Sequence, residues 1–144
     1  MNNSKFSRVS LALLSACLLF ACSLFVSCKE PHAQEDNLVG TWTSAYGDGY
    51  VITDTKITYN DGGYGFDWKA DIADISDDYI YVKKYSSGKY YCVAYKNLTE
   101  TACSFSNAYK DGGKSDCETL DEAKSEFTIE NGYFAYYSEC SKVE

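Results

Sequence analysis

The sequence predicts a mostly β domain of antiparallel strands, and two observations carry this prediction. From Leu38 onward, Tyr, Val, Ile and Thr alternate with polar residues at a period of two, which fits a pleated, half-buried sheet. Short clusters of Gly, Asn and Asp interrupt this pattern, and these residues accept the positive φ angles of tight hairpins. We therefore expect hairpin connections between strands and no βαβ crossovers.

The positions of these interruptions predict nine strands. The Asn131-Gly132 pair is the strongest hairpin signal, and a type I′ turn there would place Ile129 opposite Phe134. The expected strands are Leu38 to Tyr46, Tyr50 to Thr53, Lys56 to Tyr59, Tyr64 to Ile72, Tyr79 to Tyr85, Lys89 to Lys96, Thr101 to Tyr109, Glu126 to Glu130 and Tyr133 to Ser138.

One helix is predicted from about Asp116 to Ser125. Ser115 and Glu118 have the spacing of a capping box, in which each side chain satisfies a free backbone amide at the helix start. Apolar residues then recur at helical spacing through Leu120 and Ala123. We expect this helix to cover one end or flank of the sheet.

The residues before Leu38 have the layout of a secretory leader and a tether. A basic segment with Lys5 and Arg8 precedes an apolar segment that ends shortly before Cys28, after which the chain becomes polar. We assign residues 1–27 to a signal peptide, 28–37 to a flexible tether and 38–144 to one domain.

The residues Leu24-Phe25-Val26-Ser27-Cys28 resemble the lipobox of bacterial lipoproteins, with Phe25 where Leu is usual, as in relaxed spirochaete versions. The resemblance implies cleavage before Cys28 and a lipid anchor on that cysteine. Cys17 and Cys22 are alternative sites, and an uncleaved transmembrane anchor is a further alternative. Lys29 gives no support to an inner-membrane retention signal of the enteric type, so we expect attachment to the outer membrane of the cell envelope, with the face left open.

The charge of the expected mature chain argues against nucleic acid as a partner. All 21 acidic residues follow Cys28, against 11 lysines and no arginine once Lys5 and Arg8 are removed, which gives 11 − 21 = −10. Phosphate backbones require clustered Lys and Arg.

The stretch Leu38-Val39-Gly40-Thr41-Trp42 resembles the start of lipocalins (calycins), whose first strand carries Gly-x-Trp. The resemblance implies a small antiparallel up-and-down barrel of about eight or nine short strands with one helix near the C-terminus. The arginine that usually stacks on this tryptophan is missing from the mature chain. Similar tyrosine-rich domains follow lipoprotein leaders in treponemes. A two-sheet β-sandwich has the same alternation and is the alternative fold.

Four cysteines remain after the leader and Cys28 are set aside. An even number of cysteines in an exported chain predicts two disulfides. Of the three possible pairings, we favour Cys92 with Cys103 and Cys117 with Cys140. A metal site built from all four lacks any close Cys-x-x-Cys pair, so no metal is expected there.

The types of side chain in the predicted domain do not favour an enzyme. The single histidine, His32, lies on the tether, so no histidine remains in the domain to activate a nucleophile. Carboxylate-only catalysis stays conceivable. The densest acidic cluster consists of Asp71, Asp74, Asp77 and Asp78. A calcium site is an alternative use of these carboxylates. The sequence indicates no other cofactor.

Aromatic residues are the unusual feature of the domain, which contains all 14 tyrosines. Outward-facing rings fit either a recognition surface or cross-strand pairs that stabilise the sheet. Inward-facing aromatics could line a cavity for an apolar ligand; the candidates are Trp42, Phe66, Trp68 and Phe105. Two functions follow: a lipid-anchored module that binds a small apolar molecule or a host or envelope protein, or a structural or antigenic lipoprotein with no ligand.

Overall fold

The computed structural model describes residues 37–76 and 78–144, and every structural statement below concerns these residues. They form eight strands and one helix. The elements are β1 (Gly40–Ser44), β2 (Asp48–Ile52), β3 (Lys56–Asp61), β4 (Trp68–Ile75), β5 (Tyr79–Lys84), β6 (Tyr90–Lys96), β7 (Ala102–Asn107), α2 (Leu120–Glu126) and β8 (Ser138–Val143).

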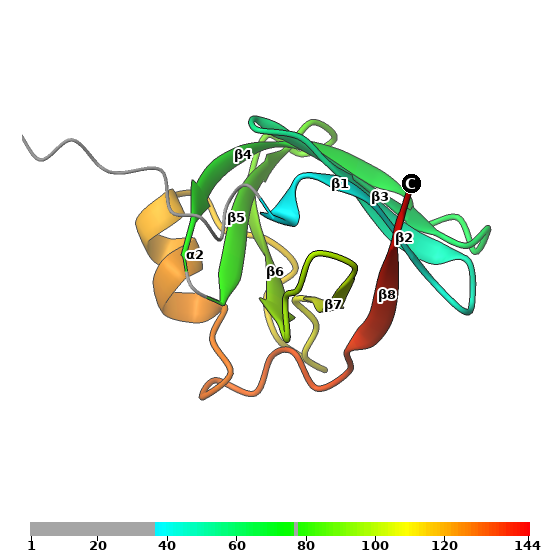
Figure 1. Ribbon diagram of the computed structural model, residues 1–144. Coiled ribbons are helices and arrows are strands. Elements are labelled where there is room, and N and C mark those ends of the chain that lie inside the picture. Colours follow the sequence, from blue (N-terminus) through cyan, green and yellow to red (C-terminus); the bar gives the residue numbers. More distant parts are fainter. Residues whose placement is uncertain (1–36, 77) are drawn as a thin grey trace, which may run out of the picture. The chain divides into compact units, whose positions relative to one another are not determined.

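The eight strands form a closed antiparallel barrel in which each strand pairs with the next one in sequence (Figure 1). β8 closes the barrel by pairing with β1, where Thr41 lies opposite Val143 and Ser44 opposite Cys140. The up-and-down barrel expected from the sequence is thus confirmed, and the sandwich alternative is wrong. Closure leaves no strand edge unpaired, which removes the sites at which sheets aggregate.

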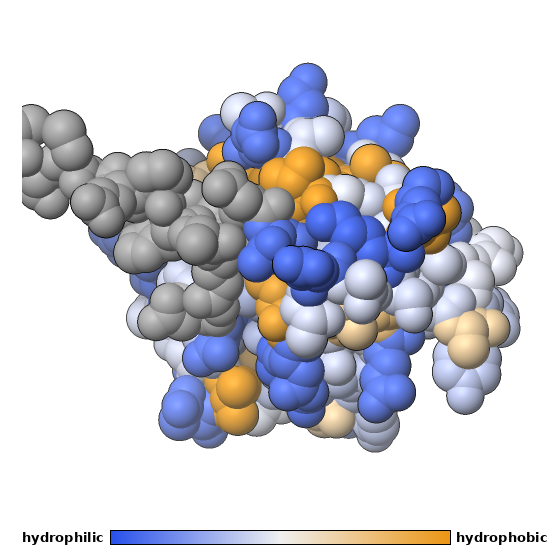
Figure 2. Space-filling model, viewed as in Figure 1, coloured by the Kyte–Doolittle hydropathy of each residue, from blue (hydrophilic) through white to orange (hydrophobic). Residues whose placement is uncertain are grey.

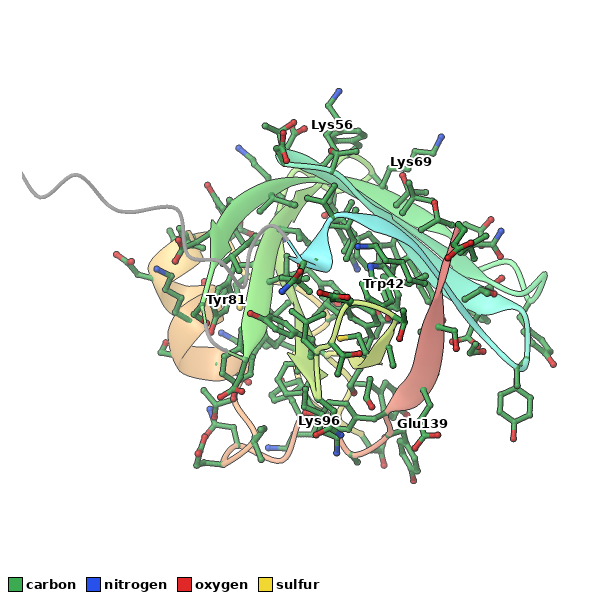
Figure 3. The ribbon with its side chains drawn as sticks, in the orientation of Figure 1. Trp42, Lys56, Lys69, Tyr81, Lys96 and Glu139 are labelled. Atoms are coloured by element: carbon green, nitrogen blue, oxygen red, sulfur yellow. The ribbon has the colours of Figure 1, made fainter. Side chains whose placement is uncertain are left out.

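Large apolar side chains fill the inside of the barrel. Trp42 lies within the barrel, whereas Lys56 and Lys69 point away from it (Figure 3). This alternation is the period of two seen in the sequence. The largest fully buried side chains include Trp42, Tyr133, Phe105, Phe127, Leu38, Ile52, Ile57, Ile80, Val82 and Val93.

The helix α2 begins one turn later than the sequence predicts. The hydroxyl of Thr119 accepts a hydrogen bond from the backbone N–H of Glu122 at 3.2 Å, so Thr119 is the N-cap. The Glu122 carboxylate accepts in turn from the backbone N–H of Glu118 at 3.0 Å. Ser115 does not cap the helix, because the chain beside it forms a β-bridge between Cys117 and Tyr90. α2 packs on the outside of β5 and β6 (Figure 1).

The predicted hairpin at Asn131-Gly132 is wrong. Residues 127–137 contain no strand, and the last strand, β8, starts only at Ser138. The Asn131 side-chain amide instead donates to the carbonyls of Ser125 and Glu126, at 2.9 and 2.8 Å. These carbonyls belong to the last turn of α2, where backbone acceptors have no partner inside the helix. Asn131 is therefore a helix cap.

The face of the molecule seen in Figure 2 is mostly hydrophilic, with hydrophobic side chains in small separate patches. Within residues 37–76 and 78–144, no helix has the length and apolar character needed to cross a membrane.

Candidate functional site

Exposed aromatic side chains gather at one end of the barrel. The connections β1–β2, β3–β4 and β5–β6, the end of β7 and the start of β8 all lie at this end, because neighbouring strands are antiparallel. We call it the aromatic end. Exposed rings concentrated in this way indicate a binding surface. Every exposed aromatic residue of the described chain lies in these connections: Tyr46, Tyr64, Phe66, Tyr85, Tyr109 and Tyr136.

A pocket of about 230 Å³ opens at the aromatic end. Its walls come from β2, β3, β7 and the residues just before β8. Typical ligand pockets for drug-sized molecules measure about 300–1,000 Å³. This pocket therefore suits a smaller molecule and is too small to enclose a long acyl chain. It is lined by Tyr50, Tyr59, Phe105, Ser106, Asn107, Tyr109, Ala135, Tyr136 and Ser138.

Three stacked rings form the inner wall of this pocket. The ring of Tyr50 lies 4.9 Å from that of Tyr59 and 4.7 Å from that of Phe105, measured between centroids. Tyr50 and Tyr59 are directly opposite each other on β2 and β3. Burial is the main cause that raises the pKa of the Tyr50 phenol well above its ordinary value.

Asn107, the last residue of β7, brings an unused hydrogen-bond acceptor to the pocket. Its side-chain oxygen Oδ1 is buried and has no hydrogen-bond partner among the described residues. A buried polar atom without a partner costs about 1–3 kcal/mol. A ligand with an N–H or O–H group at this position would supply the missing donor. The pocket thus combines apolar ring faces with one oriented polar group, the usual composition of a small-molecule site.

The four aromatic residues that the sequence suggests as lining a cavity do not share one site in the structure. Phe105 lines the pocket. Trp42 is fully buried beside Phe105, and its indole N–H donates to the carbonyl of Leu38 at 2.8 Å. Trp68 is half-buried and lies next to Tyr59, but does not line the pocket. Phe66 is 75% exposed in the β3–β4 connection, so its prediction as an inward-facing residue is wrong.

Sequence reasoning missed Tyr50, Tyr59 and Asn107 as site residues. The two tyrosines carried a usable signal, because they stand at corresponding positions on the two sides of the short Asp54-Thr55 turn. Asn107 carried none. Its position depends on barrel closure, which places the end of β7 opposite strands far away in sequence.

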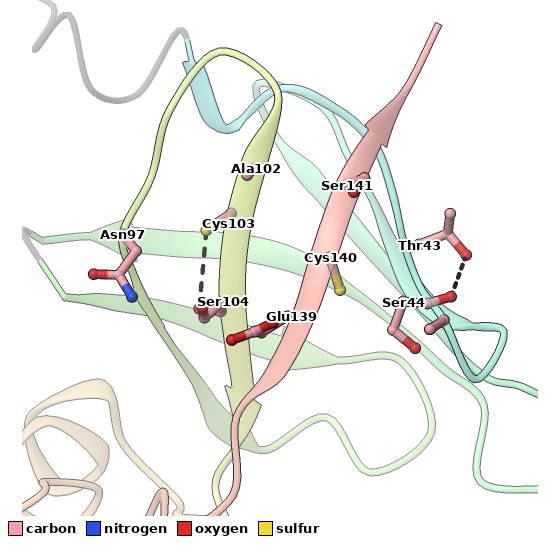
Figure 4. Close-up of a pocket in the computed structure, with 10 residues that line it drawn as sticks. Thr43, Ser44, Asn97, Ala102, Cys103, Ser104, Glu139, Cys140 and Ser141 are labelled. Carbon is pink, nitrogen blue, oxygen red and sulfur yellow. Dashed lines mark hydrogen bonds between the residues drawn. The ribbon is translucent and has the colours of Figure 1, made fainter.

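A second, larger groove of about 590 Å³ lies along β1, β7 and β8 (Figure 4). It has no aromatic side chain. Small and polar groups of Thr43, Ser44, Ser104 and Ser141 dominate its lining. Among the pockets of the described residues, the aromatic pocket is the better candidate for a ligand site, because it combines ring faces with a buried acceptor that has no partner.

The four cysteines of the domain are buried free thiols, and the predicted disulfides are not present. Cys92 lies on the outer side of β6, under α2, whereas Cys103 lies on the inner side of β7. Residues on opposite sides of a sheet cannot be bridged. Cys103 instead lies opposite Cys140 of β8, and their sulfur atoms point away from each other (Figure 4). Cys117 is placed against Tyr90 of β6 and not against Cys140.

The acidic cluster considered for calcium is used for other contacts. Asp74 forms an ion pair with Lys124 of α2 at 2.7 Å, and Asp71 accepts a hydrogen bond from the Tyr85 hydroxyl at 2.6 Å. Asp77 lies outside the described residues. In the described part of the chain, no three His, Cys, Asp or Glu side chains are grouped to hold a metal ion.

The expected lipidation site Cys28, its alternatives Cys17 and Cys22, and all of the tether except Asn37 lie outside the described residues. The described domain belongs to the class of closed, eight-stranded, antiparallel up-and-down β-barrels with one helix near the C-terminus. This is the architecture that the resemblance to lipocalins implies. No protein family, curated protein or solved structure significantly matches the chain.

Proposed function

We propose that this protein is a non-enzymatic binding module of the bacterial cell envelope, anchored through a lipid on Cys28, whose ligand site is the pocket at the aromatic end. The single observation that carries the proposal is the buried, unpartnered Oδ1 of Asn107 beside the rings of Tyr50, Tyr59 and Phe105. The ligand is a small molecule with an apolar or aromatic body and at least one hydrogen-bond donor.

The exposed rings around the pocket support this site. Tyr109 and Tyr136 line the pocket and are 65% and 80% exposed, so they border its opening. Tyrosine gives a large contact area with few rotatable bonds, which keeps the entropic cost of binding low. The anchoring part of the proposal rests on the residues around Cys28 alone.

Binding is tested by adding p-cresol to the ¹⁵N-labelled full chain and following the backbone amide signals by NMR. The ring of p-cresol fits between the tyrosines and its hydroxyl can donate to Asn107. We expect shifts at pocket residues and at least about tenfold weaker binding by Asn107→Leu, which removes the acceptor at similar volume. Ser141→Ala, in the other groove, is the matched control and should bind as the parent does. Absence of shifts at the pocket, for p-cresol and for other small aromatic donors, would contradict the proposal.

Anchoring is tested separately with Cys28→Ser. The parent should carry a mass increase of two or three acyl chains and remain with membranes. The variant should lose both, because only two or more chains hold a protein firmly to a bilayer. Equal membrane retention of parent and variant would reject the anchor and leave the pocket proposal standing.

A further inference from the structure

Two carboxylates face each other beside the ring wall of the aromatic pocket. Asp48 begins β2 and Asp61 ends β3, and the two are directly opposite in the register of these strands. Tyr50 and Tyr59 form the pair two residues further into the barrel. Because side chains two residues apart lie on the same side of a strand, the carboxylate pair borders the ring pair on the inner side.

This placement is costly for the folded protein. Like charges directly opposite each other in an antiparallel pair are destabilising. Asp61 is partly compensated, because its carboxylate accepts from the backbone N–H groups of Gly63 and Tyr64, both at 2.9 Å, and from that of Phe66. Among the described residues, the hydrogen-bond partner of the Asp48 carboxylate is the hydroxyl of Ser44.

No lysine in the described part of the chain forms an ion pair with these carboxylates. The ion pairs of the described chain involve Asp74, Asp116, Glu118 and Glu122, and none includes Asp48, Asp61 or the adjacent Asp67. Within the described residues, the negative charge beside the pocket is therefore not offset by an ion pair.

The negative charge acts on the ring wall of the pocket. Burial is the largest cause that raises the pKa of the Tyr59 phenol, and the charges of Asp48, Asp61 and Asp67 raise it further, whereas a hydrogen bond donated by the side-chain N–H of Asn107 lowers it. The same charges would stabilise a cation at this position. The electron-rich faces of Tyr50 and Tyr59 add to this preference, since aromatic rings attract cations over their faces.

We infer that the pocket selects a small organic cation: a protonated amine on an aromatic or short apolar body. The N–H groups of the amine match the open acceptor on Asn107, and its charge is favoured by the facing carboxylates and by the ring faces. A molecule with a carboxylate, such as a fatty acid, would be repelled. This inference rests on the proposed function, because it names the ligand class of the same pocket.

The test compares three molecules that share one ring and nearly one length but differ in charge: tyramine, tyrosol and 4-hydroxyphenylacetate. Each is added to the full chain and followed by the same amide signals as p-cresol. We expect the cation tyramine to bind about tenfold more tightly than neutral tyrosol, and the anion to bind most weakly. Added salt should reduce the advantage of tyramine, because partly exposed charges are screened.

Asp48→Asn should remove most of the preference for tyramine while keeping a hydrogen-bond acceptor for Ser44. Asp54→Asn, in the β2–β3 turn at the other end of the barrel, removes the same charge and should leave the preference intact. If Asp48→Asn does not fold, Asp67→Asn, whose side chain is exposed, replaces it. Equal binding of tyramine and tyrosol would overturn this inference and leave the pocket as the site. Failure of p-cresol and all three molecules to bind would overturn both.

Discussion

The side-chain ammonium of Lys142, in the last strand, lies 5.2 Å from the centre of the Trp42 ring in the first strand. It also donates a hydrogen bond to the carbonyl of Asn37 at 3.3 Å. Lys142 thus places a cation over the tryptophan of the Gly-x-Trp stretch. Gly40 makes the contact possible: a Cβ atom there would lie 2.4 Å from Cε of Lys142. The Gly-x-Trp stretch and β8 therefore form one closing contact of the barrel.

Replacing Lys142 with Met should destabilise the domain slightly. The change keeps the apolar stem over Trp42 and removes the charge together with the exposed hydrogen bond to the Asn37 carbonyl. An exposed cation–π contact contributes about 0.5–1 kcal/mol. The free energy of unfolding in urea measures the loss. Lys69→Met, on the outer side of β4, is the control and should have no effect. Equal losses in the two variants would show that the contact with Trp42 is not stabilising.

Gly40→Ala should destabilise the domain by about 1–3 kcal/mol, the usual cost of an unfavourable backbone conformation. Gly40 has φ +147°, which residues with a side chain rarely adopt, and the new methyl group would displace Lys142 from Trp42. Thermal unfolding measures the effect. Gly63→Ala, at φ +103° with open space around it, is the control for strain without displacement. In the Lys142→Met background, Gly40→Ala should lower the free energy of unfolding by less than it does in the parent. If the effects of the two substitutions on this free energy simply add, Gly40→Ala does not displace Lys142 from Trp42.

Gly49→Ala should be the most severe of the glycine changes, with a loss of more than about 3 kcal/mol. A Cβ atom on Gly49 would lie 2.0 Å from the backbone oxygen of Trp42, which belongs to the paired strand β1 and cannot rotate away. We expect loss of the near-ultraviolet circular dichroism signal of the packed aromatic core. A folded Gly49→Ala variant of parental stability would show that β1 and β2 are less closely packed than described.

Asn131→Ala should destabilise the domain by about 1–2 kcal/mol, because the carbonyls of Ser125 and Glu126 lose their side-chain partner at the end of α2. Hydrogen exchange of the α2 amides should accelerate more than that of the barrel strands. Glu130→Ala, at the neighbouring exposed position, is the control. If exchange in α2 is unchanged, Asn131 does not cap the helix.

In reducing buffer, the free energy of unfolding should fall as the pH rises above about 9. Burial is the first cause that raises the pKa of Cys103 to about 12 and that of Cys140 to about 11. In the unfolded chain these thiols lose their protons near pH 9, while the folded protein keeps them protonated. The unfolded state therefore binds fewer protons in this range, and stability decreases by up to about 1.4 kcal/mol per pH unit for each such proton.

Urea unfolding between about pH 7 and pH 11 measures this dependence. The free energy of unfolding should be constant below about pH 8, where the thiols are protonated in both the folded and the unfolded state, and should fall above about pH 9. Cys140→Ser should reduce the steepness of the fall, because one titrating thiol is removed. A parent protein whose stability is constant up to pH 11 would contradict the buried, protonated state of these cysteines.

The local pattern of the sequence was sufficient for most strands of the barrel. The alternation at period two located β1 to β7 to within a few residues, because which side of a strand a side chain faces is a local property. It failed at residues 126–138, where Asn131-Gly132 is compatible with both a hairpin and a helix cap. The choice between them depends on where α2 ends, and that depends on its packing against β5 and β6.

By itself, the sequence determined the mostly antiparallel β class, the near-terminal helix and the alternation of buried and exposed tyrosines, since each follows from periodicity and turn chemistry. Only the tertiary structure decided that Cys103 lies opposite Cys140 in the strand register, that Lys142 covers Trp42, and that Asn107 meets Tyr50 and Tyr59 in one pocket. These contacts join strands that are distant in sequence. They exist because the strand register around a closed barrel fixes which residues lie at the same height along the barrel axis and on the same face of the sheet. No local stretch of the chain contains that information.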